Sequence, residues 1–419
     1  MDLTAATRDL GPACLLAGLA LLNLNFASGA AVAQAPFAPI DAQPVAPPDV
    51  FPEGAIQTEP ALEWTALFDR NSGWTGADGI YSFARTGIDA NGAAFGTQTI
   101  FIFSDTAIGD VDINGKRLPG TTLVNNTAAV LQGGVPVPER ARFIWGRTAN
   151  NKPAALAIPD TPQSEPDDWY WFGDGIVLGD NLHIVAYRMR RLGQGGVFDF
   201  QTAGTAMLTV PLDSPDPWKN IDQADAPFFL PATPDNGDIT YGSGIMPNTA
   251  EAGAPFPDGY IYIYGVRNDI SKKLLAARVT PEAFMTFDAW RFYDGSDWVA
   301  DIEAAAPLTN RISNEMSVTP LPNGEYLLVY QQDALGQQVA VRRGASPVGP
   351  WGPSKPIYLT PEPSQDPDTF VYNAKAHPHI SMPGELLISY NVNTLDFFGD
   401  FFRDADIYRP RFIRLRYQP

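Results

Sequence analysis

The sequence predicts an all-β fold, a five-bladed β-propeller, and three observations lead to this prediction. Its 37 glycines and 39 prolines are spread along the chain between short apolar runs, as in all-β proteins with many turns. Helical patterns are nearly absent, since the one amphipathic candidate, at 280–290, is short. One order of elements recurs five times from Trp64 onward: a polar opening, an apolar strand, a turn and a second strong strand. Five matched units favour a propeller over the alternative, a large β-sandwich or jelly roll.

The five units lie 60–97 residues apart, a spacing that fits four-stranded blades with long loops. Their openings are Gly76, Gly173, Gly242, Asn314 and Ala374. Hairpin turns rich in Gly, Asn and Pro stand within three of the units, at 179–181, 322–324 and 383–384. Third strands are expected at 127–132, 205–210, 273–279, 338–343 and 411–417. The sequence therefore accounts for three strands in each blade.

The N-terminal 60 residues differ in composition from the predicted propeller. Segment 14–24 is apolar, and Ala31 and Ala33 form the small-residue pattern of a signal-peptidase site, so residues 1–33 are predicted to be a secretory signal peptide. Residues 34–60 are rich in Pro and Ala and are interpreted as a linker, which leaves 61–419 as the propeller domain. The expected location is periplasmic or secreted. No later segment approaches the ~20 apolar residues that a membrane span needs.

The charge of the chain excludes one class of partner. Asp and Glu number 47 against 28 Lys and Arg, which gives a formal net charge of −19. A surface with this much negative charge repels the phosphate backbone of nucleic acids. Nucleic acid is therefore not an expected partner. The only cysteine, Cys14, lies inside the predicted signal peptide, so the mature protein has no disulfide and depends on core burial for its stability.

Carboxylates at the repeat openings are the candidate catalytic residues. The first strand of each blade lines the central channel of a propeller, so residues at the openings are expected to be neighbours. Asp78, Asp174 and Glu315 stand at three openings, and Asp105 ends the strong strand of the first unit. Glycoside hydrolysis needs two carboxyl groups in different protonation states, and crowding separates their pKa values. For any single Asp the alternative is a turn cap.

Other polar and aromatic side chains near the openings are candidates for substrate binding. Amides and a guanidinium can bind sugar hydroxyls, and aromatic rings can stack on sugars, although most propeller aromatics belong to the core. The candidates are Asn125, Asn126, Trp171, Arg267, Asn314, Tyr372 and His377.

Metal and cofactor chemistry has little support in the sequence. A metal site needs three or four ligands, and only the two histidines His377 and His379 lie close together in the sequence, so a zinc site is not expected. No cofactor is predicted, although a structural calcium held by Asp and backbone oxygens in the channel is compatible with the sequence. The G-x-S-x-G, Walker and H-E-x-x-H motifs are absent.

Several strings in order, among them GADGIYS, FIFSDTAIG, LVNNT, NEMSVTPLPNGEYLLVY and YNAKAHPHISMPGELLISYNVN, carry a family resemblance. Over residues 64–417 the chain resembles bacterial domains of formerly unknown function that are related to the endo-D-arabinofuranases, which cut mycobacterial arabinan. The resemblance implies a five-bladed propeller and glycoside hydrolase activity, with Asp78 and Asp105 as the catalytic pair. The loop at 84–98 is longer here than in the arabinan-degrading members.

A second catalytic plan stays open. Five-bladed glycosidases of the arabinanase and fructosidase types use three carboxylates on three successive blades, and Asp78, Asp174 and Glu315 are compatible with that plan. The expected function is hydrolysis of glycosidic bonds in a polysaccharide, with furanosides such as arabinan favoured. The rivals are a non-catalytic carbohydrate-binding propeller and a propeller lyase or lactonase that uses a histidine or a metal.

Overall fold

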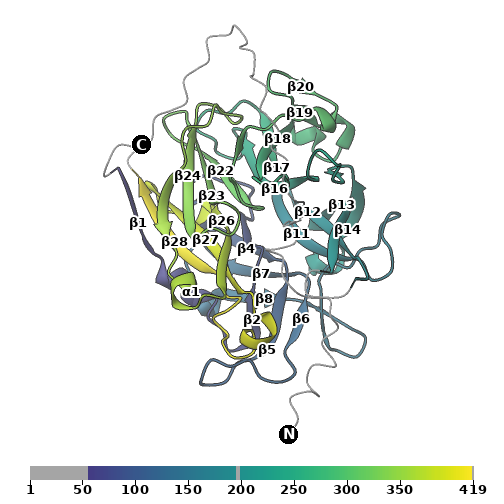
Figure 1. Cartoon of the computed structure of the whole chain (residues 1–419), viewed down its shortest axis with the longest axis vertical. Helices are drawn as coiled ribbons and strands as arrows, with labels where there is room; N and C mark the ends of the chain where they lie inside the picture. The colour runs from purple at the N-terminus through teal and green to yellow at the C-terminus, as the bar shows by residue number, and fades with distance from the viewer. Residues whose placement is uncertain (1–54, 195–198, 418–419) are drawn as a thin grey trace.

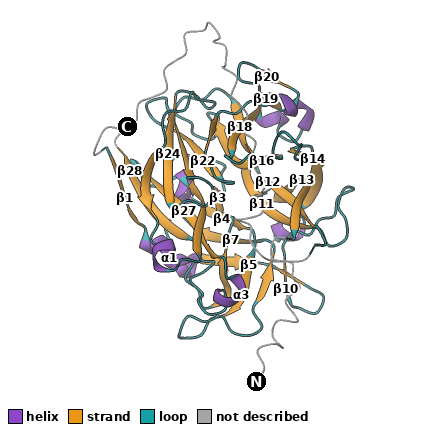
Figure 2. Cartoon of the chain, viewed as in Figure 1, coloured by secondary structure: helices purple, strands orange, loops and turns teal. Residues whose placement is uncertain are grey.

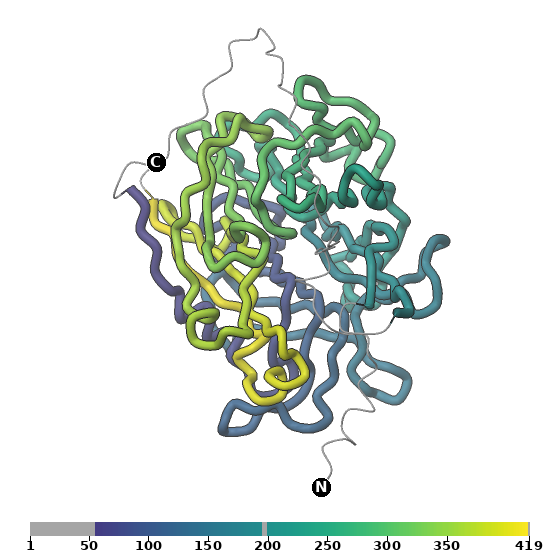
Figure 3. Tube along the Cα trace, in the orientation of Figure 1, coloured from purple at the N-terminus to yellow at the C-terminus, as the bar shows by residue number. Residues whose placement is uncertain are grey.

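The computed structural model describes residues 55–194 and 199–417, and it confirms the five-bladed β-propeller (Figure 1). The chain passes from blade to blade around the molecule, from blue through teal and green to yellow (Figure 3). The innermost strands of blades 1 to 5 pack against one another in order around the central channel. Strands dominate the fold, and the short helices lie mostly towards its periphery (Figure 2).

Each blade is an antiparallel sheet built as a meander. Blade 1 contains β3 (Tyr81–Ala84), β4 (Gln98–Phe103), β7 (Thr127–Gln132) and β8 (Ala141–Ile144). Blade 2 contains β11 (Trp169–Leu178), β12 (Asn181–Arg191), β13 (Phe200–Pro211) and β14 (Asp222–Ala226). Blade 3 contains β15 (Phe229–Leu230), β16 (Ile239–Asn248), β17 (Tyr260–Arg267), β18 (Lys273–Val279), β19 (Arg291–Tyr293), β20 (Trp298–Val299) and β21 (Thr309–Asn310). Blade 4 contains β22 (Met316–Pro320), β23 (Tyr326–Gln331), β24 (Gln338–Gly344) and β25 (Lys355–Leu359). Blade 5 contains β26 (Thr369–Ala376), β27 (Glu385–Thr394), β28 (Arg411–Tyr417) and β1 (Ile56–Pro60).

The remaining elements lie outside the five blade sheets. A three-stranded sheet contains β2 (Ser72–Ala77), β5 (Thr106–Asp110) and β6 (Thr122–Val124), and a two-stranded one contains β9 (Gly146–Arg147) and β10 (Pro153–Ala154). The α-helices are α1 (Leu62–Leu67), α2 (Glu362–Gln365) and α3 (Phe397–Asp400). The amphipathic candidate at 280–290 forms two 3₁₀ turns, Pro281–Ala283 and Phe287–Ala289.

The core lies between the blades, so both faces of a blade are apolar. On β12, Leu182 and Ile184 pack towards blade 1, in the cluster that contains Ile102. Val185, the next residue along, packs on the other side with Ile263 of blade 3. Side chains alternate between the faces of a strand, so a strand covered on both faces is an apolar run. Each such buried side chain contributes roughly 1.5–3 kcal/mol.

Three innermost strands carry a bulge at matching places. The pairing register shifts between Phe172 and Gly175 in β11, between Tyr241 and Gly244 in β16, and between Tyr372 and Lys375 in β26. A bulge inserts residues that face no partner and re-aims the side chains beside it. In these three strands, the bulge therefore determines which of the neighbouring side chains point into the central channel.

The propeller ring is closed by the first described strand. β1 pairs with β28 along its whole length, from Ile56 opposite Tyr417 to Pro60 opposite Ile413 (Figure 1). The prediction that residues 34–60 are a linker is therefore wrong for Ile56–Pro60, which forms the outer strand of blade 5. The predicted signal peptide at 1–33 and the rest of that linker, up to residue 54, lie outside the described residues.

Removal of β1 is expected to destabilise the propeller. A chain that starts at Ala61 loses the β1–β28 ladder and the hydrogen bond from Thr58 Oγ1 to the Ile357 carbonyl (2.5 Å). At ~0.5–1.5 kcal/mol net per hydrogen bond, the loss is roughly 3 kcal/mol. Urea unfolding of this chain beside one that starts at Ala55 measures the difference. Equal midpoints would mean that the strand does not stabilise the ring.

No helix in residues 55–194 and 199–417 is long and apolar enough to cross a membrane.

Candidate active site

Asp78 and Asp105 are next to each other at one end of blade 1. Asp78 precedes β3 and Asp105 follows β4, and the antiparallel pairing of these strands continues past their ends. The Asp78 N–H donates to the Asp105 carbonyl (3.1 Å), and the Ser104 N–H donates to the Asp78 carbonyl (2.9 Å). Two carboxyl groups therefore start from adjacent positions of one ladder, and both are buried, with exposed fractions of 1% and 0%.

Asp78 receives two hydrogen bonds on one of its carboxyl oxygens. Its Oδ2 accepts from the hydroxyls of Tyr372 (3.0 Å) and Tyr408 (3.1 Å). Its Oδ1 is buried and has no hydrogen-bond partner in the protein. Burial raises the pKa of Asp78 well above its ordinary value, and the neighbouring charges of Asp105 and Glu315 raise it further. The protonated form of Asp78 is thus favoured by its burial and by its acidic neighbours.

Asp105 has the same arrangement with different donors. Its Oδ1 accepts from the indole N–H of Trp171 (2.8 Å) and from the side-chain amide of Asn125 (3.1 Å). Its Oδ2 is buried without a hydrogen-bond partner in the protein. Burial raises the pKa of Asp105 to about 7, and the two donors, which favour the charged form, limit the shift. The pair therefore combines a carboxylic acid with a carboxyl that ionises near neutral pH.

Glu315 brings a third carboxyl group to this end of the channel, together with a cation. Its Oε2 lies 2.5 Å from Lys375 Nζ, and both side chains are buried. The Lys375 ammonium also lies over the ring of Tyr81, 4.5 Å from its centre. The Glu315–Lys375 ion pair therefore lies beside the Asp78–Asp105 pair.

A cavity of about 520 Å³ opens beside these carboxyls, and we call it the front cavity. Its walls come from the starts of the innermost strands and from the strands behind them. It is lined by Ser104, Trp171, Phe172, Tyr187, Met189, Thr202, Thr240, Ser243, Val266, Asn314 and Glu315. Asp105 is not on the wall itself, because Trp171 lines the cavity and meets the carboxyl through its indole N–H.

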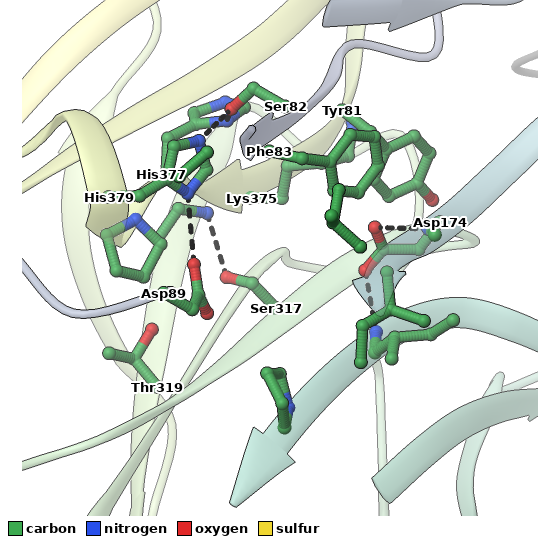
Figure 4. A pocket seen from close by; sticks show the side chains of 18 of the residues that line it. Tyr81, Ser82, Phe83, Asp89, Asp174, Ser317, Thr319, Lys375, His377 and His379 are labelled. Atoms are coloured by element: carbon green, nitrogen blue, oxygen red, sulfur yellow. Dashed lines mark hydrogen bonds and ion pairs between the residues drawn. The ribbon is translucent and has the colours of Figure 1, made fainter. Parts of the chain in front are cut away.

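A second cavity of about 610 Å³, here called the rear cavity, occupies the other end of the channel (Figure 4). It is lined by the later residues of the same strands, among them Phe83, Val177 and Thr319. Tyr81 lies between the two cavities: it lines the rear one, and its hydroxyl donates to the carbonyl of Ser243 (3.0 Å), a residue of the front wall.

Asp174 belongs to the rear cavity, contrary to the expectation that it shares one funnel with Asp78 and Glu315. Its Oδ1 accepts from the N–H of Gly175 (2.8 Å) and its Oδ2 from that of Ile245 (2.6 Å). The bulge in β11 is the physical reason, since it turns the side chain towards the backbone of blade 3. Burial raises the pKa of Asp174 to about 7.

Three predicted substrate-binding residues have structural partners away from the front cavity. Asn126 bonds the carbonyls of Ala157 (2.9 Å) and Tyr170 (3.1 Å) and the Ala157 N–H (2.8 Å), which ties a loop to blade 2. Arg267 pairs with Asp269 (3.0 Å). His377 lies in the rear cavity between two serine hydroxyls, those of Ser82 (2.7 Å) and Ser389 (2.8 Å), and burial lowers its pKa well below the ordinary value. The other four candidates, Asn125, Trp171, Asn314 and Tyr372, touch a catalytic candidate or line the front cavity.

A family model described as "Domain of unknown function (DUF5005)" matches residues 61–417. The chain belongs to this family. Its fold is similar to that of a solved structure titled as a "putative hydrolase" from Bacteroides ovatus, with a TM-score of 0.66 and 21% identity over 86% of this chain and 90% of that one. The match agrees with the prediction of a domain of unknown function, while the predicted relation to the endo-D-arabinofuranases stays a prediction.

Two α-L-arabinofuranosidases are more distant. The enzyme from Clostridium thermocellum has a TM-score of 0.39 and 12% identity, over 70% of this chain and 78% of its own. The GH62 catalytic domain from Coprinopsis cinerea has a TM-score of 0.42 and 10% identity, over 83% of this chain and 98% of its own. TM-scores this low carry no argument about the site. None of the curated proteins matches the sequence.

Tyr408 and the pairing of Lys375 with Glu315 were not predicted as parts of the site. Tyr408 lies between β27 and β28, in a segment without a motif, and its φ of 75° is unusual for a residue with a side chain. Arg117, in the loop between β5 and β6, holds this segment in place, because its guanidinium donates to the carbonyls of Phe401 (2.8 Å) and Ile407 (2.9 Å). The available signal for the ion pair was that Glu315 and Lys375 each follow the first residue of a unit, in two successive units.

Within the described residues, no group of three or more His, Cys, Asp and Glu side chains is arranged to hold a metal ion.

Proposed function

We propose that this domain is an exported glycoside hydrolase that cleaves glycosidic bonds, with furanosides such as arabinan favoured, in a polysaccharide or glycoconjugate. The observation that carries the proposal is the buried Asp78–Asp105 pair. Each carboxyl has one oxygen fixed by two donors and one oxygen without a protein partner. Two carboxyls whose environments set different pKa values are what acid–base cleavage of an acetal requires.

The surroundings of the two carboxyls suggest their roles. Asp78, whose pKa is raised by burial and by the charges of Asp105 and Glu315, is the general acid that protonates the leaving glycosidic oxygen. Asp105, ionised above about pH 7, is the base or nucleophile on the other side of the bond. Glu315, paired with Lys375, stabilises the positive charge that develops on the sugar ring in the transition state. Trp171 lines the front cavity and donates to Asp105, so it lies between the cavity and this carboxyl.

The preference for furanosides rests on the resemblance to the endo-D-arabinofuranases, in which the two corresponding aspartates form the catalytic pair. Export rests on the apolar segment 14–24 and the small-residue site that follows it. The rival lyase or lactonase reading has less support, because His377 lies in the rear cavity with both ring nitrogens bonded to serines.

The test is incubation of the purified protein with D-arabinan, L-arabinan and fructan, followed by measurement of reducing ends and product size. Release of reducing ends from at least one polymer supports the proposal. If a polymer binds but no reducing ends appear, the domain is a carbohydrate-binding propeller, and the proposal fails.

The roles of the two aspartates predict the pH dependence of kcat/KM. Because Asp105 must be ionised, activity should rise as the pH increases through about 7. Trp171→Phe removes a donor that favours the charged form of Asp105, so the pKa of Asp105 rises and the acidic limb of the profile moves to higher pH. Profiles of both proteins on one substrate check this. A limb that stays in place in the variant would exclude Asp105 as the titrating group.

A further inference from the structure

The rear cavity has the lining of a small-molecule site, although the proposed mechanism does not use it. Its lining comes from all five blades, and a few polar groups stand among apolar side chains, as in most ligand sites. The apolar part includes Phe83, Ile176, Val177, Ile245, Pro247 and Val318.

One polar atom of this lining lacks a partner. The hydroxyl of Thr319, at the end of β22, is buried and makes no hydrogen bond to the protein, and the residue is 4% exposed. A buried hydroxyl without a partner costs about 1–3 kcal/mol. A ligand hydroxyl in the cavity would supply the missing hydrogen bond.

Two carboxyl groups face the same space from different blades. Asp174 accepts hydrogen bonds from two backbone N–H groups. The side chain of Asp89 is 29% exposed, and its Oδ1 lies 3.0 Å from Nδ1 of His379. In Figure 4 Asp174 and the His377–His379 pair lie on opposite sides of the cavity, with Lys375 between them. Each carboxyl oxygen has a further lone pair that can accept from a hydroxyl.

The charge of the lining selects against anions. Lys375, the cation of the cavity, is already engaged by Glu315, while Asp89 and Asp174 add negative potential. A neutral ligand with several hydroxyls and an apolar face fits best, because its hydroxyls meet Thr319 and the carboxyls while its C–H face meets Phe83 and Pro247. A furanose or pyranose ring has this chemistry.

We propose that the rear cavity is a second sugar site, which binds one neutral sugar residue through Thr319, Asp89 and Asp174 at the end of the channel opposite to the catalytic pair. That the ligand is a sugar rests on the proposed function. Asp89 comes from the loop at 84–98, which joins β3 to β4.

Calorimetric titration of the full-length protein with D-arabinose, L-arabinose and fructose, one at a time, tests the proposal. The expected result is that at least one sugar binds, and that Thr319→Val and Asp89→Asn each weaken its binding about tenfold. Trp171→Ala, a change in the front cavity, should leave this binding unaltered. Melting temperatures close to the wild type show that the variants are folded.

Two results would overturn the proposal: none of the three sugars binds, or binding survives Thr319→Val and Asp89→Asn and is lost in Trp171→Ala. Polymer hydrolysis measured on the same proteins separates this proposal from the proposed function. If no polymer is cut but a sugar binds and Thr319→Val weakens that binding, the rear site stands and the hydrolase proposal fails.

Discussion

Asp78→Asn and Asp105→Asn are expected each to lower kcat about a thousandfold, because each removes one of the two groups that transfer protons or attack the sugar. The variants should fold, since Asn retains an oxygen that can accept from the same two donors. The measurement is initial rates of reducing-end release. The matched control is Asp235→Asn, in an exposed loop, which should retain the wild-type rate. An Asp105→Asn rate close to that of the control would contradict the assignment.

Asp105→Asn should also stabilise the protein at high pH. The pKa of Asp105 is about 7 in the folded state and near 4 in the unfolded state, so the folded state loses stability as the pH rises between these values. The lost stability is up to about 4 kcal/mol above pH 7. Asn does not titrate, so the gain in melting temperature of Asp105→Asn over the wild type should be larger at pH 8 than at pH 5. An equal difference at both pH values would mean that Asp105 titrates normally.

The second large effect is expected for Arg117→Met, which should lower the free energy of unfolding by about 3–5 kcal/mol. The Arg117 guanidinium is buried, and it donates to the carbonyls of Thr75 (3.2 Å), Phe401 (2.8 Å), Ala405 (3.1 Å) and Ile407 (2.9 Å). Met fills a similar volume but leaves these carbonyls without their donor. Urea unfolding measures the loss.

Arg85→Met is the matched control for Arg117→Met. Arg85 makes an ion pair with Asp180 (3.1 Å), whose side chain is 71% exposed, so its removal should cost no more than about 1 kcal/mol. The segment between β27 and β28 that Arg117 contacts also contains Tyr408, whose hydroxyl donates to Asp78. The Arg117→Met variant should therefore lose activity even where it remains folded. Equal unfolding midpoints for the two variants would show that the buried arginine does not stabilise the packing of the β5–β6 loop against the segment between β27 and β28.

The blades could be predicted from sequence because their signals are local. An apolar run and a Gly- or Pro-rich turn mark each hairpin, and all five predicted third strands are found, as β7, β13, β18, β24 and β28. Strand β1 could not be predicted, because its residues IQTEP show no apolar run and it forms only by pairing with the far end of the chain.

The candidate site was predictable in its chain positions and not in its geometry. Asp78 and Asp105 meet because they flank one hairpin ladder, which a sequence can indicate. The bulge that turns Asp174 away into the rear cavity depends on packing between blades 2 and 3. Tyr408 reaches Asp78 across 330 residues of sequence, and no local pattern indicates such a contact.

If the Asp78–Asp105 pair cuts a polysaccharide that the front cavity binds, loss of one carboxyl should separate binding from cleavage. Polymer binding and reducing-end release can both be measured on the same preparations of wild type and Asp105→Asn. We expect the variant to bind the uncut polymer with an affinity within a few-fold of the wild type, while only the wild type releases reducing ends. If both proteins bind the polymer and neither cuts it, the carboxyl pair is not catalytic and the domain is a binding module.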